Sequence, residues 1–81
     1  MSEYMFGIHK GPLSKEELKL WEKVATDHDC WVNGGNIPGL GWQYWFCGRN
    51  LGSPFNERLR NAVLGDLASR QEALEAGGTR Q

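Results

Sequence analysis

The sequence has little charge of one sign: nine basic and ten acidic side chains give a formal net charge of −1 over 81 residues. Proteins that coat nucleic acid through its phosphates normally carry a clear basic excess. The near balance therefore argues against a nonspecific nucleic-acid coat. At this length we expect one domain, close to the size at which a single hydrophobic core is barely sufficient.

Long apolar runs are missing as well. The first twelve residues, MSEYMFGIHKGP, include the acidic Glu3 and no apolar run of signal-peptide length. No stretch approaches the length of a membrane span. The sequence therefore predicts a cytoplasmic protein with no membrane partner, in which Cys30 and Cys47 stay reduced thiols.

Signatures of catalysis, cofactor binding and metal binding are absent. The glycine-rich run GGNIPGLG (34–41) leads toward a strand, without the lysine of a P-loop or the helix of a dinucleotide fingerprint. Zinc sites usually contain C-x-x-C, whereas this chain offers only the H-x-C spacing of His28 and Cys30. We expect no enzyme activity, cofactor or metal. The alternative is a zinc-stapled domain that uses His28, Cys30 and Cys47, if the hairpin places the two thiols opposite each other.

Aromatic residues are plentiful, with four Trp, three Phe and two Tyr. They concentrate in GLGWQYWFCGR (39–49), whose alternation predicts a strand with two distinct faces. The predicted core face carries Trp42, Tyr44 and Phe46; the other carries Gln43, Trp45 and Cys47, with Trp31 as a possible neighbour. A large exposed ring cluster usually marks a contact surface. The alternative is that all the rings fill the core.

The remaining elements are predicted from caps, turns and periodicity. Residues 3–9 suit a short strand. Ser14 and Glu17 form a capping box for a helix from Lys15 to about Thr26. We expect an irregular β-hairpin over 30–47 with a long loop at 33–41, which contains a type II turn at 37–40. A second helix is predicted from the cap Ser53 to residue 74 or 75, where Gly77-Gly78 ends it.

These elements predict a small α+β domain of order β-α-β-β-α over residues 1–76, with a two- or three-stranded antiparallel sheet packed by two helices. Residues 77–81 are expected to form a disordered tail. The alternative fold is a helical hairpin in which 30–47 is an ordered insertion.

The function predicted from these features is non-catalytic binding of another protein, as a regulator, inhibitor or adaptor of the kind that phages and mobile elements encode. Trp and Arg are enriched among interface hot spots, and the distal half of the second helix outruns the small core. The predicted contact residues are Trp31, Trp45, Arg49, Leu64 and Arg70. A homodimer formed through the same surface is an alternative.

A further alternative is single-stranded nucleic-acid binding. Aromatic side chains would stack on bases while flanking cations follow the backbone. The cations available for this role are Lys15, Lys19, Lys23, Arg49, Arg58 and Arg60. Nucleic acid ranks behind protein as a partner because acidic residues dilute the positive charge.

Overall fold

The computed structural model of the chain describes residues 2–79. Its elements are β1 (Glu3–Lys10), α1 (Lys15–Asp27), β2 (Trp31–Ile37), β3 (Gly41–Arg49) and α2 (Phe55–Thr79). The three strands form one antiparallel sheet of order β1-β3-β2. The predicted α+β fold and its element order are confirmed, and the helical-hairpin alternative is wrong.

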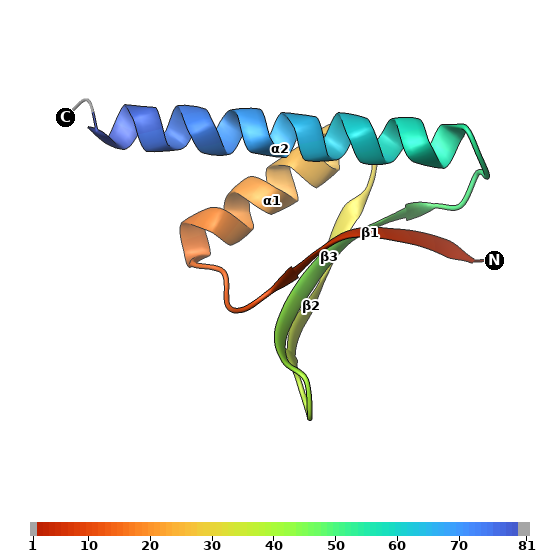
Figure 1. Ribbon diagram of the computed structural model, residues 1–81, viewed down its shortest axis with the longest axis horizontal. Helices are drawn as coiled ribbons and strands as arrows, with labels where there is room; N and C mark the ends of the chain where they lie inside the picture. The colour runs from red at the N-terminus through yellow and green to blue at the C-terminus, as the bar shows by residue number, and fades with distance from the viewer. Residues whose placement is uncertain (1, 80–81) are drawn as a thin grey trace.

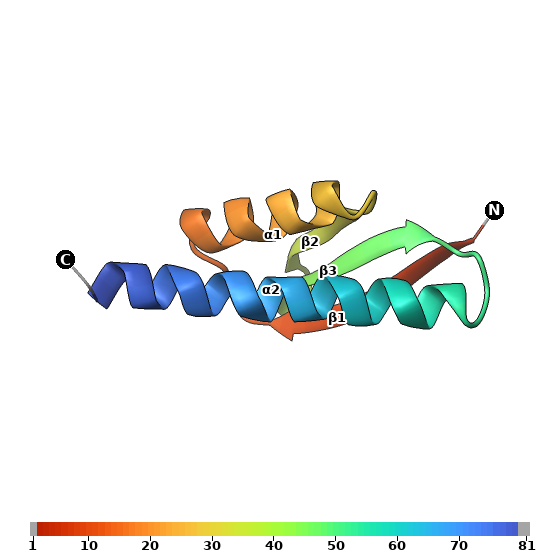
Figure 2. The ribbon, with the colours of Figure 1, turned by 90° about the horizontal axis from the view of Figure 1, so that it is seen from above.

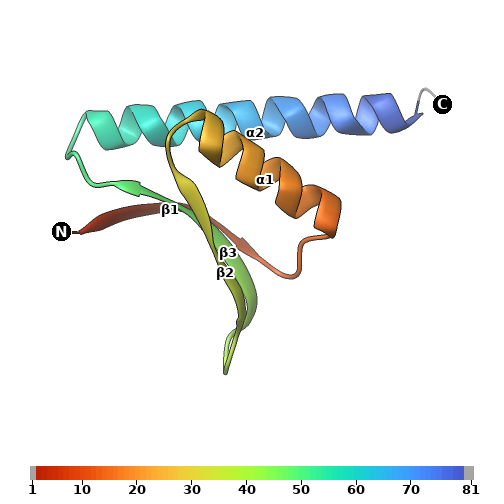
Figure 3. The same ribbon diagram turned by 180° about the vertical axis from the view of Figure 1, so that it is seen from behind.

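Both helices lie on the same side of the sheet (Figure 1). Seen from above, α1 and α2 lie next to each other and run in opposite directions (Figure 2). The β2–β3 hairpin extends away from both helices, so that neither helix covers its tip (Figure 3). Among the described residues, the other face of the sheet has no covering element.

The core lies between the helices and one face of the sheet. Phe46 of the central strand is fully buried and stacks between Trp21 of α1, at 4.6 Å between ring centroids, and Phe6 of β1, at 5.5 Å. The buried core cluster is Phe6, Trp21, Val24, Ala25, Cys30, Tyr44, Phe46, Val63 and Leu67. A small domain thus builds its core mainly from large rings, which bury much apolar area per residue.

Helix α1 is fixed at both ends by local hydrogen bonds. At its start the backbone N–H of Glu17 donates to Ser14 Oγ at 3.1 Å, and that of Ser14 donates to Glu17 Oε1 at 2.9 Å, which confirms the capping box. At its end Asp29 adopts a left-handed φ of 59°, and the Cys30 N–H donates to the Ala25 carbonyl oxygen at 2.9 Å. This Schellman-type ending directs the chain into β2.

The hairpin is more regular than predicted. β2 continues to Ile37 and pairs with β3 along its whole length, so the expected long loop at 33–41 is wrong. The connection is only the predicted type II turn, in which the Leu40 N–H donates to the Ile37 carbonyl oxygen at 3.0 Å and Gly39 has a φ of 85°. Position 34 requires a glycine because the backbones of residues 34 and 43 approach closely. A Cβ atom on residue 34 would collide with the carbonyl oxygen of Gln43.

Helix α2 differs from the prediction at both ends. It begins at Phe55, not directly after Ser53, and it continues through Gly77 and Gly78 to Thr79. Adding residues to an existing helix is far easier than nucleating one, so two glycines at the end of a long helix need not stop it. Residues 77–79 are therefore helical where a disordered tail was expected, and residues 80–81 of that tail lie outside the described residues.

Candidate functional site

The face of the sheet away from the helices is the candidate site. Directly paired residues of an antiparallel sheet project to the same face. Cys47 pairs with Met5 on one side and Trp31 on the other, and Trp45 pairs with Asn33. Since the neighbouring Phe46 points into the helix-covered core, these side chains project to the opposite face.

One bulge in β1 completes this surface. The register shifts between Phe6 and His9. A Cβ at Gly7 would meet Leu64 and Phe46, so Gly7 faces the helices, and Ile8 projects to the other side. We name this surface the open face; its side chains are Glu3, Met5, Ile8, Lys10, Trp31, Asn33, Gln43, Trp45, Cys47 and Arg49.

The centre of the open face is apolar and largely accessible. Met5 is 60%, Ile8 65% and Trp31 41% exposed, whereas Trp45 is half-buried. Cys47 is fully buried although no helix covers it, because side chains of its own face surround it. Soluble monomers seldom expose a contiguous apolar patch of this kind unless it binds something.

Charged and polar side chains surround this centre. Glu3 and Arg49 are cross-strand partners at one end of the sheet, and Lys10 pairs with Gln43 toward the other end. Beside Arg49, a shallow depression is lined by Ser2, Glu3, Trp31, Arg49, Asn50 and Leu51. An apolar centre inside a polar rim is the usual anatomy of a protein–protein interface.

The structure brings together three of the five predicted contact residues. Trp31, Trp45 and Arg49 share the open face, whereas Leu64 and Arg70 belong to α2 on the far side of the sheet. Leu64 is half-buried and packs against the core beside Gly7. These contacts give Leu64 a structural role, and its part in partner binding stays a prediction.

Arg70 joins the two helices through ion pairs. Its Nε donates to Asp66 Oδ1 at 2.9 Å and its Nη2 donates to Asp27 Oδ2 at 2.6 Å. The Arg70 guanidinium lowers the pKa of both carboxyl groups, and a contact of 2.9 Å between His28 Nε2 and Asp66 Oδ2 lowers that of Asp66 further. Asp66 and Arg70 therefore serve the pairing of α2 with α1, and a role of Arg70 in partner binding stays a prediction.

Trp42 departs from its predicted place in the core. It is 43% exposed, and it stacks on Tyr44 at 6.3 Å between ring centroids. The alternation correctly places Trp42 on the side of Tyr44 and Phe46. However, that end of the hairpin extends away from the helices (Figure 3), and Trp42 stays outside the buried core.

The two thiols do not meet across the hairpin. Trp31, not Cys30, pairs with Cys47, and this shift of one residue sends the two sulfur atoms to opposite faces. Burial raises the pKa of Cys30 to about 11 and also raises that of Cys47. Within residues 2–79, no three His, Cys, Asp or Glu side chains gather in a way that could hold a metal ion.

Met5 and Ile8 were missed by the sequence reasoning. Their strand reads Glu-Tyr-Met-Phe-Gly-Ile-His-Lys, in which strict alternation would put Met5 and Ile8 on different faces. The signal that could have corrected this is Gly7, because a glycine inside a strand often marks a bulge. With one residue bulged, both apolar side chains reach the open face.

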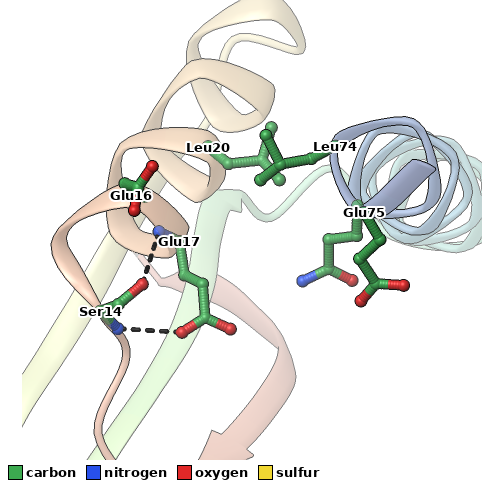
Figure 4. Close-up of a pocket in the computed structure, with 7 residues that line it drawn as sticks. Ser14, Glu16, Glu17, Leu20, Leu74 and Glu75 are labelled. Carbon is green, nitrogen blue, oxygen red and sulfur yellow. Dashed lines mark hydrogen bonds between the residues drawn. The ribbon is translucent and has the colours of Figure 1, made fainter. Parts of the chain in front are cut away.

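A second concave region lies between the start of α1 and the end of α2. Leu20 and Leu74 point toward each other there, and Ser14, Glu16, Glu17, Gln71 and Glu75 complete the lining (Figure 4). Glu17 is already engaged in the capping box with Ser14. Five of its seven lining residues are polar or acidic, so the cleft has less of the character of an apolar docking surface than the open face has.

Comparisons of the chain with protein-family models, with curated proteins and with solved structures give no significant match. Across residues 2–79, neither helix combines the length and the apolar character that crossing a membrane requires.

Proposed function

We propose that this chain is a non-catalytic protein-binding module that docks its partner on the open face. The observation that supports this most directly is the apolar centre formed by Met5, Ile8 and Trp31, at 60%, 65% and 41% exposure, on a sheet face that no described element covers. Trp45 and Arg49 add residue types common among interface hot spots. Such a module would act as a small regulator, inhibitor or adaptor, in a cytoplasmic setting where its thiols stay reduced.

A protein partner fits this face better than a nucleic acid. Lys15, Lys19 and Lys23 are exposed on α1, on the side of the sheet that the helices cover. Lys10 and Arg49 are the basic residues of the open face, and Glu3 lies beside Arg49. A charged strand of nucleic acid would gain little from this arrangement.

The test compares Trp31→Ala with Trp42→Ala. The two side chains are of the same type and nearly equally exposed, 41% and 43%, but lie on opposite faces of the sheet. Tagged wild-type and variant proteins would be used for affinity capture from the native host's lysate, with thermal melts run in parallel. We expect Trp31→Ala to lose at least about 90% of the captured partner, because truncating a central hot spot costs 2 kcal/mol or more, and Trp42→Ala to retain it.

The proposal is wrong if Trp31→Ala, shown to be folded by its melt, captures the same proteins in the same yield as wild type. It is also wrong if both variants lose capture equally, since binding would then depend on the hairpin tip or on general ring stacking. Arg49→Ala provides a second variant that leaves the core untouched, because Arg49 is exposed.

A further inference from the structure

We infer that the occupant of the open face is a second copy of this chain, packed sheet to sheet. The twofold axis of this dimer lies between the two sheets and runs perpendicular to β1. This inference rests on the proposed function, because it names the partner of the same surface. In such a dimer the same patch serves both copies, as in most symmetric oligomers. The order of charges along β1 favours this arrangement.

The open-face residues of β1 are, in order, Glu3, Met5, Ile8 and Lys10: an acid, two apolar residues and a base. A copy of β1 laid antiparallel over this row brings Glu3 to Lys10 of the second copy and Lys10 to Glu3 of the second copy. The same symmetry places Met5 against Ile8 twice. The row is therefore complementary to itself in charge and in apolar character, and pairs of opposite charge at a rim set orientation more than affinity.

The other face-to-face twofold arrangement is less favourable. An axis parallel to the strands would lay β1 over β2 of the second copy, and β2 (Trp31–Ile37, WVNGGNI) carries no charged residue. Glu3 and Lys10 would then lose water without gaining a partner, which costs free energy. That axis would also bring Arg49, on the central strand, toward Arg49 of the second copy. The perpendicular axis instead lays Arg49 over the uncharged Gln43 of the second copy, and Glu3 stands next to Arg49 and opposite Lys10 of the second copy.

The apolar centre suits a homodimer. Homodimer interfaces are more apolar than transient ones and are depleted of charge at their core. In the perpendicular arrangement the centre of the sheet, with Trp45 and Cys47, lies near the axis, and Trp31 flanks it on each copy. Trp45 of one copy would then lie over Cys47 of the other, and Trp31 over Asn33, so the facing sheet would cover the exposed rings.

The test uses charge reversal at the two ends of β1 and measures molar mass by light scattering across a concentration series. Wild type should dimerise. Glu3→Lys and Lys10→Glu should each raise the dimer dissociation constant about tenfold or more, because each replaces both symmetric attractions with repulsions. The double variant Glu3→Lys/Lys10→Glu should dimerise like wild type, and an equimolar mixture of the two single variants should form a mixed dimer.

Substitutions of two exposed apolar residues provide the second measurement. Ile8→Asp should abolish the dimer, whereas Leu40→Asp should leave it intact, since Leu40 is equally exposed (66% against 65%) but lies in the hairpin turn. If Ile8→Asp leaves the dimer dissociation constant unchanged, the dimer uses another surface and the inference is wrong. An Ile8→Asp-sensitive dimer without rescue by the double variant overturns the antiparallel β1 arrangement.

The two proposals can fail separately. If wild type stays monomeric at every concentration while Trp31→Ala still loses a captured protein of another kind, the second copy is excluded and the protein-binding function stands. If wild type dimerises but neither Trp31→Ala nor Ile8→Asp affects dimerisation or capture, both proposals fall.

Discussion

Phe46 and Trp42 belong to the same alternating row of β3 but differ fully in environment. Phe46 has no exposed surface and stacks on Trp21, whereas Trp42 is 43% exposed. Alternation in a sequence predicts the face to which a side chain projects. It does not predict how far the covering helices reach along the strand, and that is why the core position expected for Trp42 is wrong.

We therefore expect the alanine substitutions of these two rings to differ sharply. Phe46→Ala should lower the free energy of unfolding by about 3–5 kcal/mol, the usual cost of emptying a buried aromatic site, which is enough to unfold a small domain. Trp42→Ala should cost only about 1 kcal/mol because the residue is already 43% exposed and lies outside the buried core. Urea unfolding followed by circular dichroism measures both. Equal losses in the two variants would show that the hairpin tip is buried in solution.

At the scale of elements, the fold was largely predictable because strong local signals agree with one another. The capping box begins α1, and Pro38-Gly39 fixes the hairpin turn. The course of β2 was not predictable in this way, because Gly34 and Gly35 resemble loop residues and only their approach to β3 explains them. The register that separates Cys30 from Cys47 likewise depends on where β2 begins, which is set by the Schellman-type end of α1.

The candidate site was predictable in part for the same reason. Alternation along β3 placed Trp45 and Cys47 away from the core, and the hairpin brought Trp31 beside them. The contribution of β1 required the bulge at Gly7, and the absence of a covering helix required the tertiary arrangement. Neither follows from periodicity in a single segment.

The ion pairs between α1 and α2 should make stability depend on acidic pH. Arg70 holds the pKa of Asp66 and Asp27 below the usual value near 4. A carboxyl group whose pKa is depressed by folding stabilises the fold above its unfolded pKa, and this stabilisation is lost as pH falls through the folded pKa. We expect the wild-type melting temperature to fall between about pH 5 and pH 2, and Asp66→Asn to melt lower at pH 7 with a flatter pH profile.

The matched control is Glu72→Gln, which removes an exposed carboxylate from the same helix. Its pH profile should follow that of wild type. Some acid sensitivity should remain in Asp66→Asn, because hydrogen bonds to Ser14 also lower the pKa of Glu17. An Asp66→Asn profile as steep as that of wild type would mean that the helix pair does not depend on these charges.

For the whole molecule, the decisive property is that its longest row of basic side chains and the apolar centre of the open face lie on different sides of the sheet. The row Lys15, Lys19 and Lys23 belongs to the helical layer, and the apolar centre of Met5, Ile8 and Trp31 belongs to the open face. Binding of single strands needs both features on one surface, with cations along the backbone and rings under the bases. A net charge of −1 adds no long-range attraction.

We therefore expect a fluorescein-labelled single-stranded oligonucleotide to show no saturable anisotropy change below about 100 μM protein at physiological salt, at the weak end of nonspecific nucleic-acid affinities. Trp31→Ala should leave this weak signal unchanged, and so should Lys19→Gln, which removes one cation from the helical side. Tight binding that weakens steeply with salt and disappears in Trp31→Ala would contradict this expectation. In that case the open face would be a stacking platform for bases, and Lys10 and Arg49, the cations beside its rings, would be the residues to substitute next.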